Sequence, residues 1–172
     1  GRSYESSGGF LFTHRGYSGP AVLDLSHVAV RSQTSGGEQA VLRVAWSLLD
    51  APAWQREFAG STGQVLTVLA RHLPQRLAER LMTERHVPTD RRAPELRREE
   101  RTLLVDALTS YALPWNGHEG FGKAEVTGGG VALDEVDPRT LESRRHPGLF
   151  FCGEMLDAFG PIPSAALLFL LF

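Results

Sequence analysis

Apolar and polar residues alternate with different periods along the chain. Over residues 41–48, Leu42, Val44, Trp46 and Leu48 alternate with their neighbours, and this period of two is typical of a half-buried β-strand. The aromatic-rich stretch 9–14 also predicts a strand. Pro20 suits the first turn of a helix, where a missing N–H is harmless, so a short helix is expected over 20–26. The first part of the chain is therefore expected to be rich in β-structure.

Between about residues 54 and 114 the apolar residues recur with the period of a helix. Ser61 is a suitable N-cap for a first helix, Pro74 begins a second, and Pro114 ends a third. The apolar positions are Val65, Leu66, Val68 and Leu69; Leu77, Leu81 and Met82; and Leu96, Leu103, Leu104, Ala107, Leu108 and Tyr111. Because each helix is amphipathic, we expect a small bundle that buries its own apolar faces.

From residue 115 onward the pattern returns to strands and turns. The apolar runs 131–133 and 148–152 predict buried strands, and Cys152, inside the second run, is expected to be a buried, unreactive thiol. We therefore predict an α+β fold in three parts: a β-rich part over 1–53, a helical bundle over 54–114, and returning strands over 115–172. The simplest topology inserts the bundle into a β-rich body.

Composition and charge exclude several classes of protein. The chain of 172 residues has 18 basic and 20 acidic residues and a net charge of −2, so nothing electrostatic favours a nucleic-acid or membrane-surface partner. The arginine-rich stretch 85–101 is interleaved with acidic residues, which favours a solvated helix face over an RNA-binding surface. The six histidines show no metal-ligand spacing, so no metal is expected.

The two ends of the chain and its single cysteine indicate where in the cell the protein is expected. The given residues show no stretch with the basic start and apolar core of a signal peptide, and the last eight are apolar but far fewer than the roughly 20 that span a bilayer. One cysteine fits a reducing compartment, so a cytoplasmic location is expected. A soluble protein seldom ends on a bare apolar run, so we expect a piece of a longer protein.

Two short segments carry candidate binding chemistry. Thr127, Gly128, Gly129 and Gly130 place three glycines after a β-like run, which suits backbone that approaches a flat or charged ligand. A tight turn is the alternative and, on these residues alone, the favoured one. Gly153, Glu154 and Asp157 follow a predicted strand, where a carboxylate could accept hydrogen bonds from ribityl or ribose hydroxyls; an acid that caps the next helix is the alternative.

Three blocks in order resemble one family. They are 9–23 (with Phe12-Thr13-His14 and Gly16-Tyr17-Ser18-Gly19-Pro20), 124–131, and 140–143 with 147–157. They are similar to blocks of the bacterial NAD(P)/FAD-dependent oxidoreductases of the aminoacetone oxidase and bile-acid dehydro-steroid reductase types. The resemblance covers nearly the whole chain up to about Ile162. It implies an insert domain with a β-barrel-like part and a helical part, followed by a return into an incomplete FAD-binding α/β body.

The resemblance also implies roles. The Thr127–Val131 segment would lie beside the isoalloxazine ring of FAD, and Glu154 and Asp157 would face its ribityl and pyrophosphate region. The block 13–20 would cover the flavin and shape the pocket for a small-molecule substrate. The implied reaction is hydride transfer between a nicotinamide or a small organic substrate and the flavin, with NAD(P)H as a possible co-substrate. No residue is identified as a catalytic acid or base.

The chain departs from the family pattern at two places. It has no glycine-rich turn for the ADP half of FAD, so the missing N-terminal half of the parent protein is an expected partner, and this fragment alone is expected to be inactive. After residue 162 it has Pro163-Ser164-Ala165-Ala166 where the family has Gly-Gly-Tyr-Asn, which predicts a truncated or aberrant end. The alternative is a stand-alone, non-enzymatic interaction module made of a β-barrel and a helical bundle.

Overall fold

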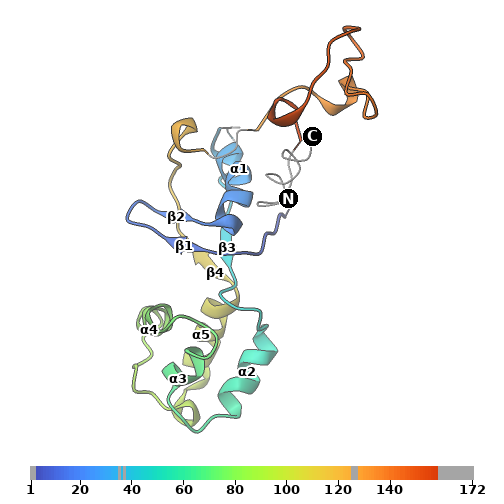
Figure 1. Ribbon diagram of the computed structural model, residues 1–172. Helices are drawn as coiled ribbons and strands as arrows, with labels where there is room; N and C mark the ends of the chain where they lie inside the picture. Colours follow the sequence, from blue (N-terminus) through green and yellow to red (C-terminus); the bar gives the residue numbers. More distant parts are fainter. Residues whose placement is uncertain (1–2, 35, 37, 125–127, 159–172) are drawn as a thin grey trace. The chain divides into compact units, whose positions relative to one another are not determined.

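The computed structural model describes residues 3–34, 36, 38–124 and 128–158 (Figure 1). The chain divides into two compact units. We call Val41–Trp115 the helical unit, and Gly1–Ala40 together with Asn116–Phe172 the split unit. The two units are described separately below.

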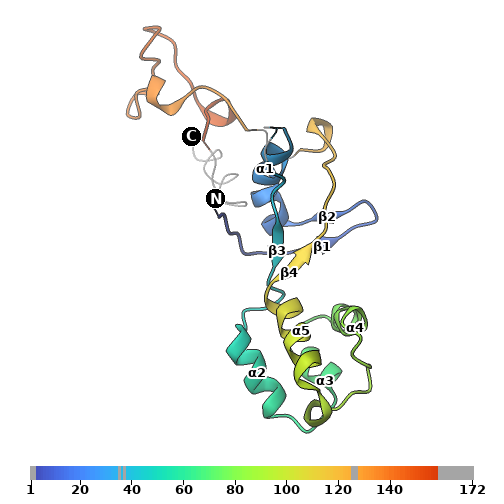
Figure 2. The same cartoon turned by 180° about the vertical axis from the view of Figure 1, so that it is seen from behind.

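The helical unit consists of four α-helices and a short two-stranded sheet (Figures 1 and 2). In chain order its elements are β3 (Leu42–Val44), α2 (Ala51–Ala59), α3 (Val65–Leu69), α4 (Gln75–Glu84), a 3-10 turn (Ala93–Glu95), α5 (Arg98–Thr109) and β4 (Tyr111–Leu113). The strands β3 and β4 are antiparallel, with Leu42 opposite Leu113 and Val44 opposite Tyr111. This pairing joins the two ends of the helical segment.

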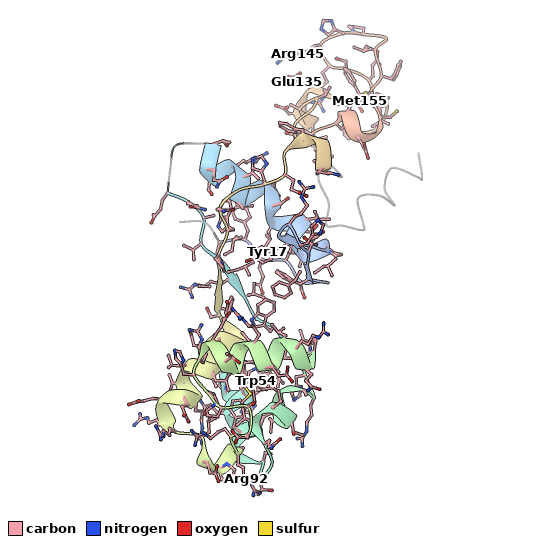
Figure 3. The ribbon with its side chains drawn as sticks, turned by 90° about the vertical axis from the view of Figure 1, so that its left-hand side faces the viewer. Tyr17, Trp54, Arg92, Glu135, Arg145 and Met155 are labelled. Atoms are coloured by element: carbon pink, nitrogen blue, oxygen red, sulfur yellow. The ribbon has the colours of Figure 1, made fainter. Side chains whose placement is uncertain are left out.

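The apolar faces of the helices meet in one core. Trp54 and Phe58 of α2 are fully buried and their rings stack with centroids 5.8 Å apart. Figure 3 shows Trp54 inside the helical unit. The other buried members of the core are Val65, Val68, Leu69, Leu73, Ala78, Leu81, Met82, Val87, Ala93, Leu96, Leu104, Val105, Ala107 and Leu108. The predicted bundle thus buries its own faces, as the helical spacing indicated.

The helix α2 was not predicted. It begins after Asp50, whose side chain accepts a hydrogen bond from the Ala53 N–H at 2.8 Å, and Pro52 lies in its first turn. Trp54 and Phe58, four residues apart, provide its buried face. An acidic N-cap and a proline were therefore readable signals. The helix includes residues on both sides of the predicted boundary at 53, and that boundary stays a prediction.

The expected elements 41–48 and 96–111 are shorter than predicted. The strand pairs only over Leu42–Val44, because its partner β4 has three residues. Exposure nevertheless alternates over residues 41–46, with Val41 and Ala45 exposed and Trp46 half-buried. The prediction is wrong for Leu48, which is 98% exposed because the strand has ended before it. The helix α5 ends at Thr109, ahead of Pro114, because the chain turns at Ser110 (φ −153°) into β4.

The first part of the split unit is a hairpin followed by a helix. The strands β1 (Leu11–Phe12) and β2 (Tyr17–Ser18) pair antiparallel, and α1 runs from Pro20 to Thr34. The predicted strand 9–14 therefore pairs over two residues only, and the predicted helix continues well beyond residue 26. The continuation keeps apolar residues such as Val28 and Val30 in the helix, and Arg31 lies in its last turn.

The second part of the split unit is a chain of turns. Its regular elements are 3-10 turns at Phe121–Lys123, Leu133–Glu135 and Gly153–Met155, joined by single β-bridges. The predicted strands at 131–133 and 148–152 are wrong: only the bridges Val131 to Leu156 and Glu142 to Phe150 form there. Phe150 and Cys152 are exposed, so the expectation of a buried thiol is wrong as well. Burial of such runs requires neighbouring strands, and the described residues supply none.

The two units differ sharply in burial. Among the described residues, seventeen buried hydrophobic residues lie in the helical unit, whereas the split unit contains two, Ala29 and Val136. The described residues form a mixed α/β arrangement with five α-helices and short strands and without a closed barrel. The predicted α+β class is confirmed. Among the described helices, none is long and apolar enough to cross a membrane.

Candidate functional site

The two predicted binding segments meet in the structure. We call residues 128–131 the glycine segment and residues 153–157 the acidic segment. Val131 and Leu156 form a parallel β-bridge. The Val131 N–H donates to the Met155 carbonyl at 2.8 Å, and the Asp157 N–H donates to the Val131 carbonyl at 2.9 Å. Sequence positions some 25 residues apart are therefore held side by side by backbone hydrogen bonds.

The glycine segment has unusual backbone geometry. Gly129 and Gly130 have φ values of +95° and +150°, which side-chain-bearing residues rarely adopt. A Cβ built on Gly129 would have nothing within 4 Å, so open space lies beside its backbone. Neither Gly128 nor Gly129 takes part in a hydrogen bond among the described residues. Thr127, the remaining predicted residue of this segment, lies outside the described residues.

The acidic segment presents two exposed carboxylates. Gly153, with φ +73°, begins the 3-10 turn that holds Glu154, and Asp157 follows directly after the bridge. Both Glu154 and Asp157 are exposed. Exposed carboxylates accept hydrogen bonds from hydroxyl groups, and they repel phosphate groups of like charge. The alternative interpretation, an acid that caps the next helix, falls partly on residues beyond 158, which are not described.

The residues that lie between these two segments in the chain form a series of turns. Glu135 and Arg145 form an ion pair of 2.5 Å, and both are labelled with Met155 in Figure 3. The Asp137 carboxylate accepts hydrogen bonds from the Arg139 N–H at 2.8 Å and the Thr140 N–H at 3.2 Å. These bonds lower the pKa of Asp137 below its ordinary value of 3.8. The negative charge of Asp137 therefore stabilises the turn formed by residues 137–140.

The block 13–20 forms a structural turn. The Thr13 hydroxyl accepts hydrogen bonds from the N–H groups of Arg15 and Gly16 at the hairpin tip. At the start of α1, the Ala21 N–H donates to the Gly9 carbonyl at 3.3 Å. This favours the strand-to-helix turn over an anion site at the helix start. The role in substrate binding that the resemblance implies for this block stays a prediction.

The sequence did not reveal what joins the glycine and acidic segments. The joining groups are the backbone atoms of Val131, Met155 and Asp157, which are alike in every residue type, so no side-chain signal marks them. Among the described residues, no group of three or more His, Cys, Asp or Glu is placed to hold a metal. The expectation of no metal stays a prediction.

Comparison with known proteins places the chain in a family. Residues 2–126 match the family model described as "HI0933-like protein barrel and H2TH domain". The chain is similar to a ribosomal RNA dihydrouridine synthase of Escherichia coli, with 38% identity over 87% of this chain and 36% of that protein. It is also similar to a ribosomal RNA dihydrouridine synthase of Haemophilus influenzae, with 36% identity over the same shares.

A third relative matches over a shorter stretch. It is a 3-dehydro-bile acid delta(4,6)-reductase of Clostridium scindens, with 38% identity over 51% of this chain and 21% of that protein. The chain spans about a third of the length of the first two relatives. The expected resemblance to bile-acid reductases is thus found over about half of the chain. The two matches that cover most of the chain are to ribosomal RNA dihydrouridine synthases. The family domain occurs in flavoprotein-type families. Because the family model covers most of the chain, the protein belongs to the HI0933-like family.

Proposed function

We propose that this chain is part of an FAD-dependent reductase that adds hydrogen across a carbon–carbon double bond conjugated to a carbonyl group. The observation that carries the flavin part is the pairing of the glycine and acidic segments. The two segments were predicted to bind one cofactor from different parts of the sequence, and they lie side by side.

The names of the relatives support one type of reaction. Dihydrouridine differs from uridine by two hydrogen atoms across a double bond that is conjugated to a ring carbonyl. A 3-dehydro-delta(4,6) bile acid likewise carries double bonds conjugated to its 3-keto group. Both names therefore describe reduction of an activated double bond, and hydride transfer is chemistry that a reduced flavin supplies when bound.

The residues of this chain fit part of such a cofactor. The N–H groups of Gly128 and of Gly129, where an added Cβ would meet nothing within 4 Å, would donate to polar atoms at the edge of the flavin ring. Glu154 and Asp157 would accept hydrogen bonds from ribityl hydroxyls, while their charge disfavours contact with the pyrophosphate. Binding of the ADP half would require residues outside this chain, since the sequence has no glycine-rich dinucleotide turn.

Ribosomal RNA uridine is the substrate that the comparisons favour. The two relatives of that name match 87% of the chain, against 51% for the bile-acid reductase. This proposal departs from the expectation of a small-molecule substrate without nucleic acid, which rested on the near-balanced charge. A bile acid or a similar unsaturated ketone is the second candidate, favoured by the third relative.

The full-length protein that contains this chain tests the proposal. We expect it to be purified with FAD, identified by its absorption spectrum and by chromatography of the released cofactor. We expect NADPH or NADH to reduce the flavin, and ribosomal RNA that lacks dihydrouridine to reoxidise it without oxygen. Nucleoside mass spectrometry would then detect dihydrouridine in the RNA.

Two results separate the candidates. Reoxidation by a 3-oxo-delta(4,6) bile acid, with no dihydrouridine formed in RNA, would replace the RNA substrate by the small molecule. A full-length protein that contains no flavin and binds none when FAD is added would contradict the whole proposal.

A further inference from the structure

Gly130 lies where the glycine and acidic segments touch. A Cβ built on Gly130 would lie 2.5 Å from the Met155 carbonyl oxygen and 3.0 Å from the Asp157 nitrogen. Both of these atoms belong to the hydrogen bonds that join the segments, through Val131. The contact is with backbone, which cannot turn aside as a flexible side chain does. Any side chain at position 130 must therefore push the acidic segment away.

Gly129 provides the contrast within the same segment. Its φ of +95° also favours glycine, but an added Cβ there would meet nothing within 4 Å. A side chain at position 129 would strain the backbone and occupy the open space, without touching the acidic segment. The two neighbouring glycines therefore have separable roles, one that leaves space beside the backbone and one that permits the contact.

We infer that Gly130 is a positioning residue. By allowing the close backbone contact with residues 155–157, it keeps Glu154 and Asp157 near the backbone of Gly128 and Gly129, so that one ligand can contact both segments. The inference rests on the proposed function for the identity of that ligand as FAD. The pairing itself stands on the hydrogen bonds and distances of the structure. Displacing the acidic segment would leave the carboxylates out of reach of a ligand that the glycine backbone holds.

The test compares three variants of the full-length protein: Gly130→Ala, Gly129→Ala and Gly122→Ala. Gly122 is exposed and has nothing within 4 Å of an added Cβ, so it is the matched control. Two quantities are measured: amide hydrogen exchange at Val131 and Asp157 without FAD, and the dissociation constant of FAD. Exchange at amides of the helical unit shows that each variant is folded.

We expect Gly130→Ala to speed exchange at Val131 and Asp157 by about tenfold or more and to weaken FAD binding by at least about tenfold. Gly129→Ala should weaken FAD binding but leave exchange at the two amides near the wild-type rate. Gly122→Ala should change neither quantity.

Three results overturn the inference: unchanged exchange in Gly130→Ala, faster exchange with unchanged FAD affinity, or equal exchange rates in the variants at 129 and 130. A wild-type protein that binds no FAD would contradict the proposed function instead. In that case the exchange comparison still decides whether Gly130 holds the two segments together.

Discussion

Single residues in the turn around Asp137 show how local hydrogen bonds shape this chain. The Asp137 carboxylate accepts two backbone N–H groups, while the Asp137 N–H donates to the Glu142 carbonyl at 2.9 Å. Leu141 has a φ of +61°, which costs energy for a residue with a side chain. The turn is thus held by an ionised carboxylate against local strain, and its order should depend on pH.

The first prediction concerns this pH dependence. The pKa of Asp137 is lowered below 3.8 by its hydrogen bonds, so the folded turn favours the charged carboxylate. Its stabilising effect is fully present above pH 3.8 and is lost as the pH falls through the lowered pKa. We expect amide exchange at Arg139 and Thr140, corrected for its intrinsic pH dependence, to become faster below that value.

Asp137→Asn is the control for this prediction, because an amide oxygen still accepts hydrogen bonds but does not titrate. Its corrected exchange rates should not change over the same range of pH. A wild-type turn whose exchange is equally insensitive to pH would contradict the role given to the carboxylate.

At the scale of elements, the helices of the helical unit are specified by caps and by apolar spacing. The Asp50 side chain caps α2, and the Glu100 carboxylate accepts from the Arg97 N–H at the start of α5. Glu100 also pairs with Arg91 at 3.2 Å, so one acid joins two segments of the unit. Two substitutions separate the contributions of cap and core.

The second prediction concerns the N-cap of α2. Asp50→Ala removes the acceptor of the Ala53 N–H and should lower the free energy of unfolding of the helical unit by about 1 kcal/mol. Asp50→Asn retains an acceptor oxygen and should change the stability little. Urea unfolding followed by circular dichroism measures both values, and equal losses in the two variants would contradict a capping role.

The third prediction compares two neighbouring leucines of α5. Leu104 is fully buried, whereas Leu103 is 49% exposed. Leu104→Ala leaves a cavity in the core and should cost about 2–5 kcal/mol, while Leu103→Ala should change the free energy of unfolding by less than about 1 kcal/mol. The same urea titration measures the difference, and similar losses at both positions would show that the face of α5 has been assigned wrongly.

At the scale of the whole molecule, burial is concentrated in one unit. The helical unit holds the continuous apolar core, whereas the described part of the split unit exposes large apolar side chains. Those side chains are Tyr4, Leu11, Phe12, Phe121, Leu133, Leu149, Phe150 and Met155. Folding requires burial of enough apolar surface to offset the loss of chain entropy. The helical unit buries such a core, whereas the described residues of the split unit do not.

The fourth prediction follows from this contrast. A fragment of residues 41–115 should fold alone and unfold cooperatively in urea, with tryptophan fluorescence, to which the buried Trp54 contributes, as the signal. The 172-residue chain should in addition bind a hydrophobic dye such as ANS, and the 41–115 fragment should not. A fragment that unfolds without cooperativity, or binds the dye as strongly, would contradict the division of the core.

The sequence by itself determined the helices with apolar residues at every third or fourth position, because the hydrogen bonds of a helix are local. Leu81, Met82, Leu104 and Leu108 were expected in the core and are buried there. The missed helix α2 had its signals in Asp50 and Pro52. The two candidate segments were singled out from the run of glycines and from acids placed after an apolar run. Their binding role stays a prediction.

The tertiary structure alone decided how the extended segments pair. A strand takes its hydrogen bonds from residues distant in the chain, so an apolar run such as 148–152 does not reveal whether a partner exists. For the same reason the exposure of Cys152 and the bridge between Val131 and Leu156 could not be derived from local pattern. The need for glycine at position 130 arises from the backbone of residues 155–157. Only the folded chain brings this backbone within 3 Å of the place that a Cβ at position 130 would occupy.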